Sequence, residues 1–106
     1  MNHQKRGEYR NPALLKFCHT VDCTVESPYC NGREVVPCHS NMGDDGHGRG
    51  IKADDLFVAA GCGKCHDFLD RRGKDWKAHD RDEIQWYHDR GIKRTLRLAV
   101  LAGVKL

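Results

Sequence analysis

The spacing of apolar residues predicts short strands in the first half of the chain. Residues 18–38 hold β-branched pairs that alternate with the turn-forming dipeptides Ser27-Pro28 and Asn31-Gly32; the pairs are Thr20-Val21, Thr24-Val25 and Val35-Val36. This pattern predicts short strands joined by turns. A further buried strand or turn is expected within Ile51–Ala60. The intervening Ser40–Gly50 is so rich in Gly and Asp that it predicts a long exposed loop.

Three other stretches carry helical signals. Pro12–Phe17 opens with a proline, which is favoured at the start of a helix. From Cys65 onward, residues recur at steps of three and four, which predicts a helix of about two turns ending near Gly73. Asp80–Ala102 has an apolar pattern that follows acidic residues, and acids in a first turn complement the helix dipole. Gly91 is a point at which this last helix could divide.

Size and composition indicate one domain that needs support beyond its core. Of 106 residues, 39% are hydrophobic and 31% are charged, so a covalent or metal staple is expected to supplement apolar burial. Six cysteines can supply it. Because no apolar run of signal-peptide length precedes Cys18, we expect a cytoplasmic protein, in which paired cysteines favour metal over disulfides. No segment has the ~20 apolar residues that cross a bilayer, so no membrane association is expected.

The net charge is +3, and basic residues cluster near both ends of the chain. The clusters are Lys5, Arg6, Arg10 and Lys16, and Lys93, Arg94, Arg97 and Lys105. Such clusters suit a polyanion such as nucleic acid, and they equally suit an ordinary solvated surface. The helix from Asp80 includes Trp86 and Tyr87. It has enough apolar residues either to close the core or to form the face of a homodimer.

The stretch Cys62-Gly-Lys-Cys-His66-Asp has three readings. As C-x-x-C-H it would attach haem, as C-x-x-C it would supply half of a zinc site, and as a His opening a helix it would hold the cation of a nuclease. Haem attachment requires an export signal, which we do not find, so no haem is expected. Zinc is favoured, because two short-spaced cysteine pairs close a tetrahedral site.

The second pair of zinc ligands must come from four candidates, which are Cys18, Cys23, Cys30 and Cys38. Cys23 and Cys30 flank the Ser27-Pro28 turn, which can fold both onto one metal, although spacing alone does not decide the choice. We therefore select Cys23, Cys30, Cys62 and Cys65 as ligands of a structural Zn²⁺. Cys18 and Cys38 are interpreted as small buried apolar residues.

Zinc ligation by the thiols leaves His66 free for a second site. On a helix His66 shares a face with Asp70 one turn later, and an imidazole and a carboxylate at that spacing can hold a divalent cation. His39 follows the strand expected near Val36, and a neutral His beside a metal-bound phosphate suits a general base for water. Each residue alone also fits a surface or packing role, so their order along the chain is the stronger indication.

Four stretches in combination carry a family resemblance. They are Cys30-Asn-Gly, His39-Ser-Asn, Gly48-Arg-Gly-Ile-Lys-Ala-Asp-Asp-Leu56 and Cys62-x-x-Cys-His-Asp-x-x-Asp-Arg71. The pattern resembles the YbcO-like family of phage and prophage proteins, whose expected activity is that of a nuclease, and these resemble the HNH (His-Me finger) endonucleases. The resemblance covers about residues 17–90.

The resemblance implies an α+β fold, namely a small zinc-stapled ββα-metal (HNH-like) domain with short strands, the long Gly/Asp loop and a C-terminal helix. This domain would span residues 17–106, after a polar basic segment at 1–16. The resemblance also implies His39 as general base and Asp55, in the position of the middle Asn, as the residue that orients it. His66 and Asp70 would ligate the catalytic cation.

The family pattern also bears on the metals. It favours Cys23 over Cys18 as a zinc ligand, because Cys23–Cys30 resembles the usual cysteine-to-cysteine stretch. Asp55 stands in place of Asn and Asp70 in place of the His that many HNH enzymes have, and such carboxylates move the preference toward Mg²⁺ or Mn²⁺, with Zn²⁺ as a further option. Cys38 stands where many HNH enzymes carry a metal-binding His.

The expected function is metal-assisted hydrolysis of phosphodiester bonds in nucleic acid, with DNA as the expected substrate. Arg49 and Lys52 lie on the loop beside His39 and are candidates to bind flanking phosphates. The alternative is a non-catalytic zinc module that binds nucleic acid or a phage recombination or replication partner.

Overall fold

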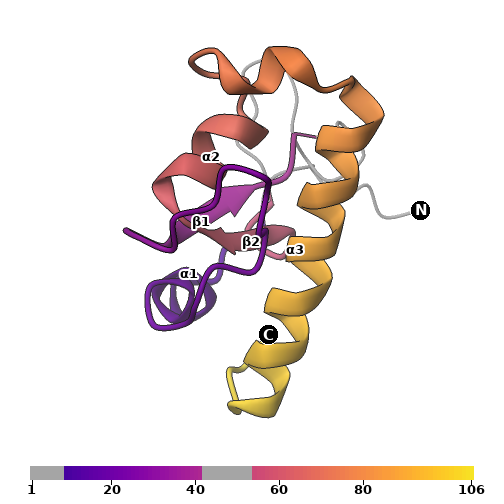
Figure 1. Cartoon of the computed structure of the whole chain (residues 1–106). Helices are drawn as coiled ribbons and strands as arrows, with labels where there is room; N and C mark the ends of the chain where they lie inside the picture. The colour runs from indigo at the N-terminus through magenta and orange to yellow at the C-terminus, as the bar shows by residue number, and fades with distance from the viewer. Residues whose placement is uncertain (1–8, 42–53) are drawn as a thin grey trace, which may run out of the picture.

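The structure, a computed structural model, describes residues 9–41 and 54–106. Within these residues the protein has an α+β fold. Its elements, in order, are α1 (Pro12–Cys18), β1 (Val36–His39), β2 (Val58–Gly61), α2 (Gly63–Leu69), the 3₁₀ helix η2 (Asp75–Ala78) and α3 (Arg81–Leu101). The two strands lie between α1 and α2, and α3 runs along β2 (Figure 1). No helix in the described ranges is both long and apolar enough to cross a membrane.

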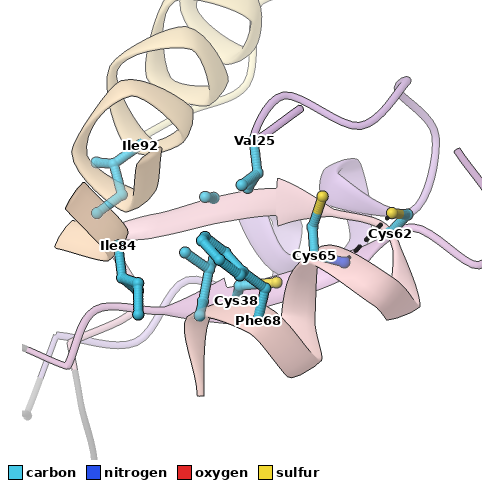
Figure 2. Close-up of a cluster of buried hydrophobic side chains, with 9 residues drawn as sticks. Val25, Cys38, Cys62, Cys65, Phe68, Ile84 and Ile92 are labelled. Atoms are coloured by element: carbon cyan, nitrogen blue, oxygen red, sulfur yellow. Dashed lines mark hydrogen bonds between the residues drawn. The ribbon is translucent and has the colours of Figure 1, made fainter. Parts of the chain in front are cut away.

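The strands pair antiparallel, with His39 opposite Val58. Every residue of β2 is buried, and its two faces contact different clusters. Val58 and Ala60 pack with Leu14, Cys18 and Ala99, whereas the alternate residue Ala59 joins the cluster around Phe68. This second cluster lies between α2, α3 and the sheet (Figure 2). A strand covered on both faces explains why it reads as an unbroken apolar run.

Helix α1 begins as its proline predicts. Asn11 is the N-cap, its side chain accepts the backbone N–H of Leu14, and Pro12 occupies the first turn. Leu14 and Cys18, four residues apart, are fully buried on one face. The helix therefore runs through residues 16 and 17, between which the sequence predicts the start of the domain, and packs against one face of the sheet.

The strands expected at Thr20-Val21 and Thr24-Val25 are wrong, because this segment is an irregular loop. Val25 is fully buried in the core. The Thr24 hydroxyl lies 2.8 Å from the Ala60 carbonyl oxygen and 3.1 Å from the Thr95 hydroxyl on α3. These β-branched side chains tie the loop to β2 and α3 and do not join a strand ladder.

Helix α2 is displaced toward the N-terminus from the range expected. It starts at Gly63, not Cys65, because Cys62 is the N-cap and its Sγ accepts the backbone N–H of Cys65 at 3.4 Å (Figure 2). It ends at Leu69, not near Gly73. Asp70 is the C-cap, and Arg71 then takes a left-handed conformation with φ of 55°.

Helix α3 runs unbroken through Gly91, so the suggested division does not occur. A Cβ on Gly91 would lie 2.9 Å from the Cβ of Ala59 and 3.0 Å from Cγ2 of Val25. The glycine is therefore where α3 makes its close approach to β2, and it does not end the helix.

Candidate functional site

Four cysteine sulfurs converge beside the N-terminus of α2. They belong to Cys23, Cys30, Cys62 and Cys65, and all lie within 4.8 Å of one another. The Sγ atoms of Cys23 and Cys65 are 3.7 Å apart, and those of Cys30 and Cys62 are 3.8 Å apart. Four thiolates about 2.3 Å from one zinc ion in a tetrahedron are separated by about 3.8 Å. The cluster thus has the dimensions of a structural zinc site, and it unites the four cysteines selected from the sequence.

Backbone N–H groups point at these sulfurs and favour their thiolate form. Cys62 N–H donates to Cys23 Sγ at 3.3 Å, and Ser27 N–H donates to Cys65 Sγ at 3.4 Å. The hydrogen bond with Cys65 lowers the pKa of Cys23 to about 4 and outweighs the opposing effect of burial. The same hydrogen bond, together with burial, raises the pKa of Cys65. This arrangement supplies the outer hydrogen bonds that metal thiolates require.

The other two cysteines lie outside the cluster. Cys18 and Cys38 are almost completely buried. Burial raises the pKa of Cys18 to about 11, and it raises the pKa of Cys38 as well. Both side chains are therefore neutral thiols in apolar surroundings, as the sequence indicated.

The second feature is a histidine paired with a buried carboxylate. His39 is the last residue of β1, and its Nε2 lies 2.9 Å from Oδ1 of Asp55. Asp55 is only 2% exposed. Because a carboxylate can only accept, the neutral imidazole carries its proton on Nε2, and the lone pair of Nδ1 is left to act as a base.

Asp55 is braced by the segment that precedes α1. The backbone N–H of Asn11 donates to Oδ2 of Asp55 at 2.9 Å, and Arg10 Nη1 lies 3.6 Å from Oδ1. Burial acts to raise the pKa of Asp55, but the hydrogen bonds from His39 and Asn11 outweigh it and hold the pKa below its usual value. The sequence does not reveal this brace, since Asn11-Pro12 signals only a helix start and its partner lies 44 residues away.

The third feature is the pair His66 and Asp70 at the end of α2. His66 Nε2 and Asp70 Oδ2 are 3.0 Å apart. Two ligand atoms that each lie about 2.1 Å from an octahedral cation, at right angles, are separated by about 3.0 Å. Burial acts to raise the pKa of Asp70, but the hydrogen bonds from His66 and Asn41 and the charges of His66 and Arg72 together outweigh it, so the pKa is lowered and the carboxylate is ionised. With the ring proton of His66 on Nδ1 instead of Nε2, the same separation would fit two adjacent positions around a divalent cation.

Within the described ranges, the four cysteines are the one group of three or more His, Cys, Asp or Glu side chains placed to share an ion. The pair of His66 and Asp70 thus offers two protein ligands. Such a pair leaves several coordination positions to water and to phosphate oxygens, as is usual for Mg²⁺ in phosphate chemistry.

Asn41 connects the two histidine–carboxylate pairs. It lies two residues after His39, and its Nδ2 donates to the Leu69 carbonyl at 3.2 Å and to Asp70 Oδ1 at 3.4 Å. The end of β1 is thereby held against the end of α2. Asn41 thus brings the segment directly after His39 into contact with Asp70, one of the two expected cation ligands. Arg49 and Lys52, the expected phosphate contacts, lie outside the described residues.

Comparison with known proteins identifies a family and a similar solved structure. A solved structure described as "Structure of a putative bacteriophage protein from Escherichia coli str. K-12 substr. MG1655" superposes with a TM-score of 0.68. It is 27% identical, and the match covers 85% of this chain and 99% of that one. No curated protein matches the chain at a significant level. A family model described as "Putative nuclease YbcO" matches residues 13–104, and the chain therefore belongs to the YbcO family.

Proposed function

We propose that the protein is a metal-dependent endonuclease of the HNH type that hydrolyses phosphodiester bonds of DNA. The observation that carries this proposal is the bond of 2.9 Å between His39 and the buried Asp55, held by Asn41 beside the pair of His66 and Asp70. An oriented imidazole next to a site for a divalent cation is what water-mediated cleavage of a phosphodiester requires. The family description, which names a nuclease, supports the same conclusion.

In the proposed reaction His39 removes a proton from the attacking water through Nδ1. Asp55 keeps the proton of the neutral ring on Nε2 and stabilises the imidazolium that forms. His66 and Asp70 hold the cation, Mg²⁺ or Mn²⁺ with Zn²⁺ as a further option. When bound, a divalent cation neutralises charge on the phosphate and on the leaving oxygen. The zinc held by the four cysteines has a structural role and takes no part in the reaction.

A plasmid assay tests the proposal. The protein is desalted, its zinc content is measured, and supercoiled DNA is incubated with and without added Mg²⁺ or Mn²⁺. We expect nicking that needs the added cation and falls by at least two orders of magnitude in His39→Ala, in line with the ~10²–10⁴-fold typical of a general base. His19→Ala is the matched control, because His19 is an exposed histidine whose ring bonds the Val35 carbonyl, away from Asp55. Equal nicking by His39→Ala and the parent would exclude His39 as the base.

One observation favours the alternative of a non-catalytic zinc module that binds nucleic acid. Arg72 Nη2 lies 2.7 Å from Asp70 Oδ2, so the carboxylate is neutralised by a side chain of the protein as well as by His66. While this ion pair is formed, Asp70 cannot ligate a cation. A binding module should bind DNA and not cleave it at any cation concentration. If the protein is a nuclease, Arg72→Ala should free Asp70 and lower the Mg²⁺ concentration needed for half-maximal nicking.

A further inference from the structure

A hollow next to Asp70 has no role in the chemistry described so far. Its volume is about 570 Å³, and it is lined by Asn41, Leu69, Asp70, Arg71 and Arg81. Asn41 and Asp70 belong to the proposed active site, so the hollow opens directly beside the pair that would hold the cation. Any ligand there would neighbour the group undergoing reaction.

The charge in this hollow comes from two arginines that reach it from different elements. Arg71 follows α2 and Arg81 begins α3. Both are exposed, and neither side chain has a hydrogen bond or ion pair with any described residue. Arg72, which also follows α2, differs because it pairs with Asp70. Two such guanidinium groups lining one hollow favour an anion with several oxygens, such as a phosphate.

The backbone at Arg71 gives an independent indication. Its φ of 55° lies in the left-handed region, directly after the C-cap of α2, where glycine is the usual residue. A side chain at that position strains the backbone, and strain of this kind is concentrated at functional sites. Arg71 also lines the hollow, so the residue with the strained backbone is one of the two that bring positive charge to it.

We propose that Arg71 and Arg81 form a phosphate clamp that binds a backbone phosphate of the nucleic acid next to the phosphate at His66 and Asp70. The clamp rests on the proposed function, since it assigns a further subsite to the same substrate strand. Asp70 does not repel this phosphate, because its charge is offset by Arg72, 2.7 Å away, and in the proposed site also by the cation. The clamp sets the position of the strand relative to His39 and takes no part in proton transfer.

The test measures binding in a His39→Ala background, so that cleavage does not interfere. Short DNA oligonucleotides, single-stranded and duplex, each carry one methylphosphonate in place of a phosphate, scanned along the strand. In this background we expect one position at which removing the charge weakens binding about tenfold, as for a charged hydrogen bond. When Arg71→Gly or Arg81→Ala is added, the methylphosphonate at that position should no longer weaken binding. The effects of methylphosphonates at the other positions should not change, which is the signature of direct coupling.

Arg71→Gly also separates loss of binding from loss of structure. Glycine removes the side chain and the strain of the positive φ together, so the variant should melt at or above the parent temperature while its affinity falls. The slope of log affinity against log salt should decrease by about 0.7–0.9 for each phosphate that is no longer neutralised. Arg97→Ala is the matched control, because it removes an exposed arginine from the same helix as Arg81, about 24 Å away at ~1.5 Å per residue.

The outcomes distinguish the clamp from the proposed function. Coupling at one phosphate without any cleavage by the unmodified protein would support the clamp and overturn the nuclease. Cleavage by the unmodified protein without coupling at any phosphate would support the nuclease and overturn the clamp. An equal loss of affinity in Arg97→Ala, or no binding of any oligonucleotide, would overturn the clamp, because binding would then be diffuse or absent.

Discussion

Nε2 of His88 lies 3.0 Å from the carbonyl oxygen of Cys38, the residue that precedes His39. His88 is buried on α3, so the longest helix of the fold holds the end of β1 from which the proposed base projects. A carbonyl can only accept, and Nε2 therefore donates. The position of His39 thus depends on a side chain that would never touch the substrate.

Replacing His88 should affect both stability and rate. His88→Leu removes the buried donor, which should lower the free energy of unfolding by about 1–3 kcal/mol and slow nicking. His88→Gln keeps an N–H donor of similar reach and should restore part of both. Urea unfolding and initial nicking rates measure the two effects. If His88→Leu nicks DNA at the parent rate, α3 does not position His39.

The pH dependence of stability should reveal the ionised Asp55. Its folded pKa lies below the ordinary 3.8, so its contribution is complete above about pH 4 and is lost as the pH falls through the folded value. Asp55→Asn should therefore cost about 1–3 kcal/mol at neutral pH, with the difference from the parent shrinking below pH 4. Urea unfolding at several pH values measures it, and a pH-independent difference would contradict an electrostatic origin. Asp55→Ala should slow nicking, because His39 Nε2 then loses its acceptor and the tautomer of the ring is no longer fixed.

The cysteine cluster should control folding through its metal. Cys62→Ser should lower the zinc content from one ion per chain to none and remove the cooperative thermal melt. Zinc binding at such sites contributes about 10–16 kcal/mol, which is comparable to the whole stability of a small domain. Cys18→Ala is the control, because Cys18 is buried elsewhere. The Cys18→Ala variant should lose some stability, because the shorter side chain leaves a cavity, and it should keep its full zinc content. Elemental analysis and thermal melts decide between them, and a Cys62→Ser variant that melts like the parent would rule out a structural site.

Gly91→Ala tests the close approach of α3 to β2. The added Cβ would meet Ala59 at 2.9 Å, and neither group can move away, so we expect a loss of about 1–3 kcal/mol despite a gain in helix propensity of about 1 kcal/mol. Gly63→Ala at the start of α2 is the control. There the nearest atom is Oε2 of Glu34 at 3.8 Å, so little change is expected. Equal stability of the two variants, from urea unfolding, would contradict this packing.

The sequence predicted the local features well, because they depend on neighbours in the chain. Pro12 marked the start of α1, and the spacing of His66 and Asp70 placed them together on α2. The C-x-x-C pair, the turn between Cys23 and Cys30 and the family resemblance together selected four cysteines as expected zinc ligands, and the structure brings these four sulfurs together.

Long-range packing was not predictable in the same way. Thr24 and Val25 have strand-forming side chains, but their partners on β2 and α3 draw the segment into a loop. Gly91 is a helix breaker by propensity and a close-contact residue in the fold, and only the position of Ala59 distinguishes the two roles. The brace between Asn11 and Asp55 joins residues 44 apart, beyond the reach of any local pattern.

The side chain of Asn11 has a second partner at the far end of the chain. Its Nδ2 donates to the carbonyl of Lys105 at 2.9 Å, across a separation of 94 residues, while its backbone N–H holds Asp55. The support of Asp55 therefore includes the segment that follows α3, and it cannot be fully assembled before residue 105 has been synthesised.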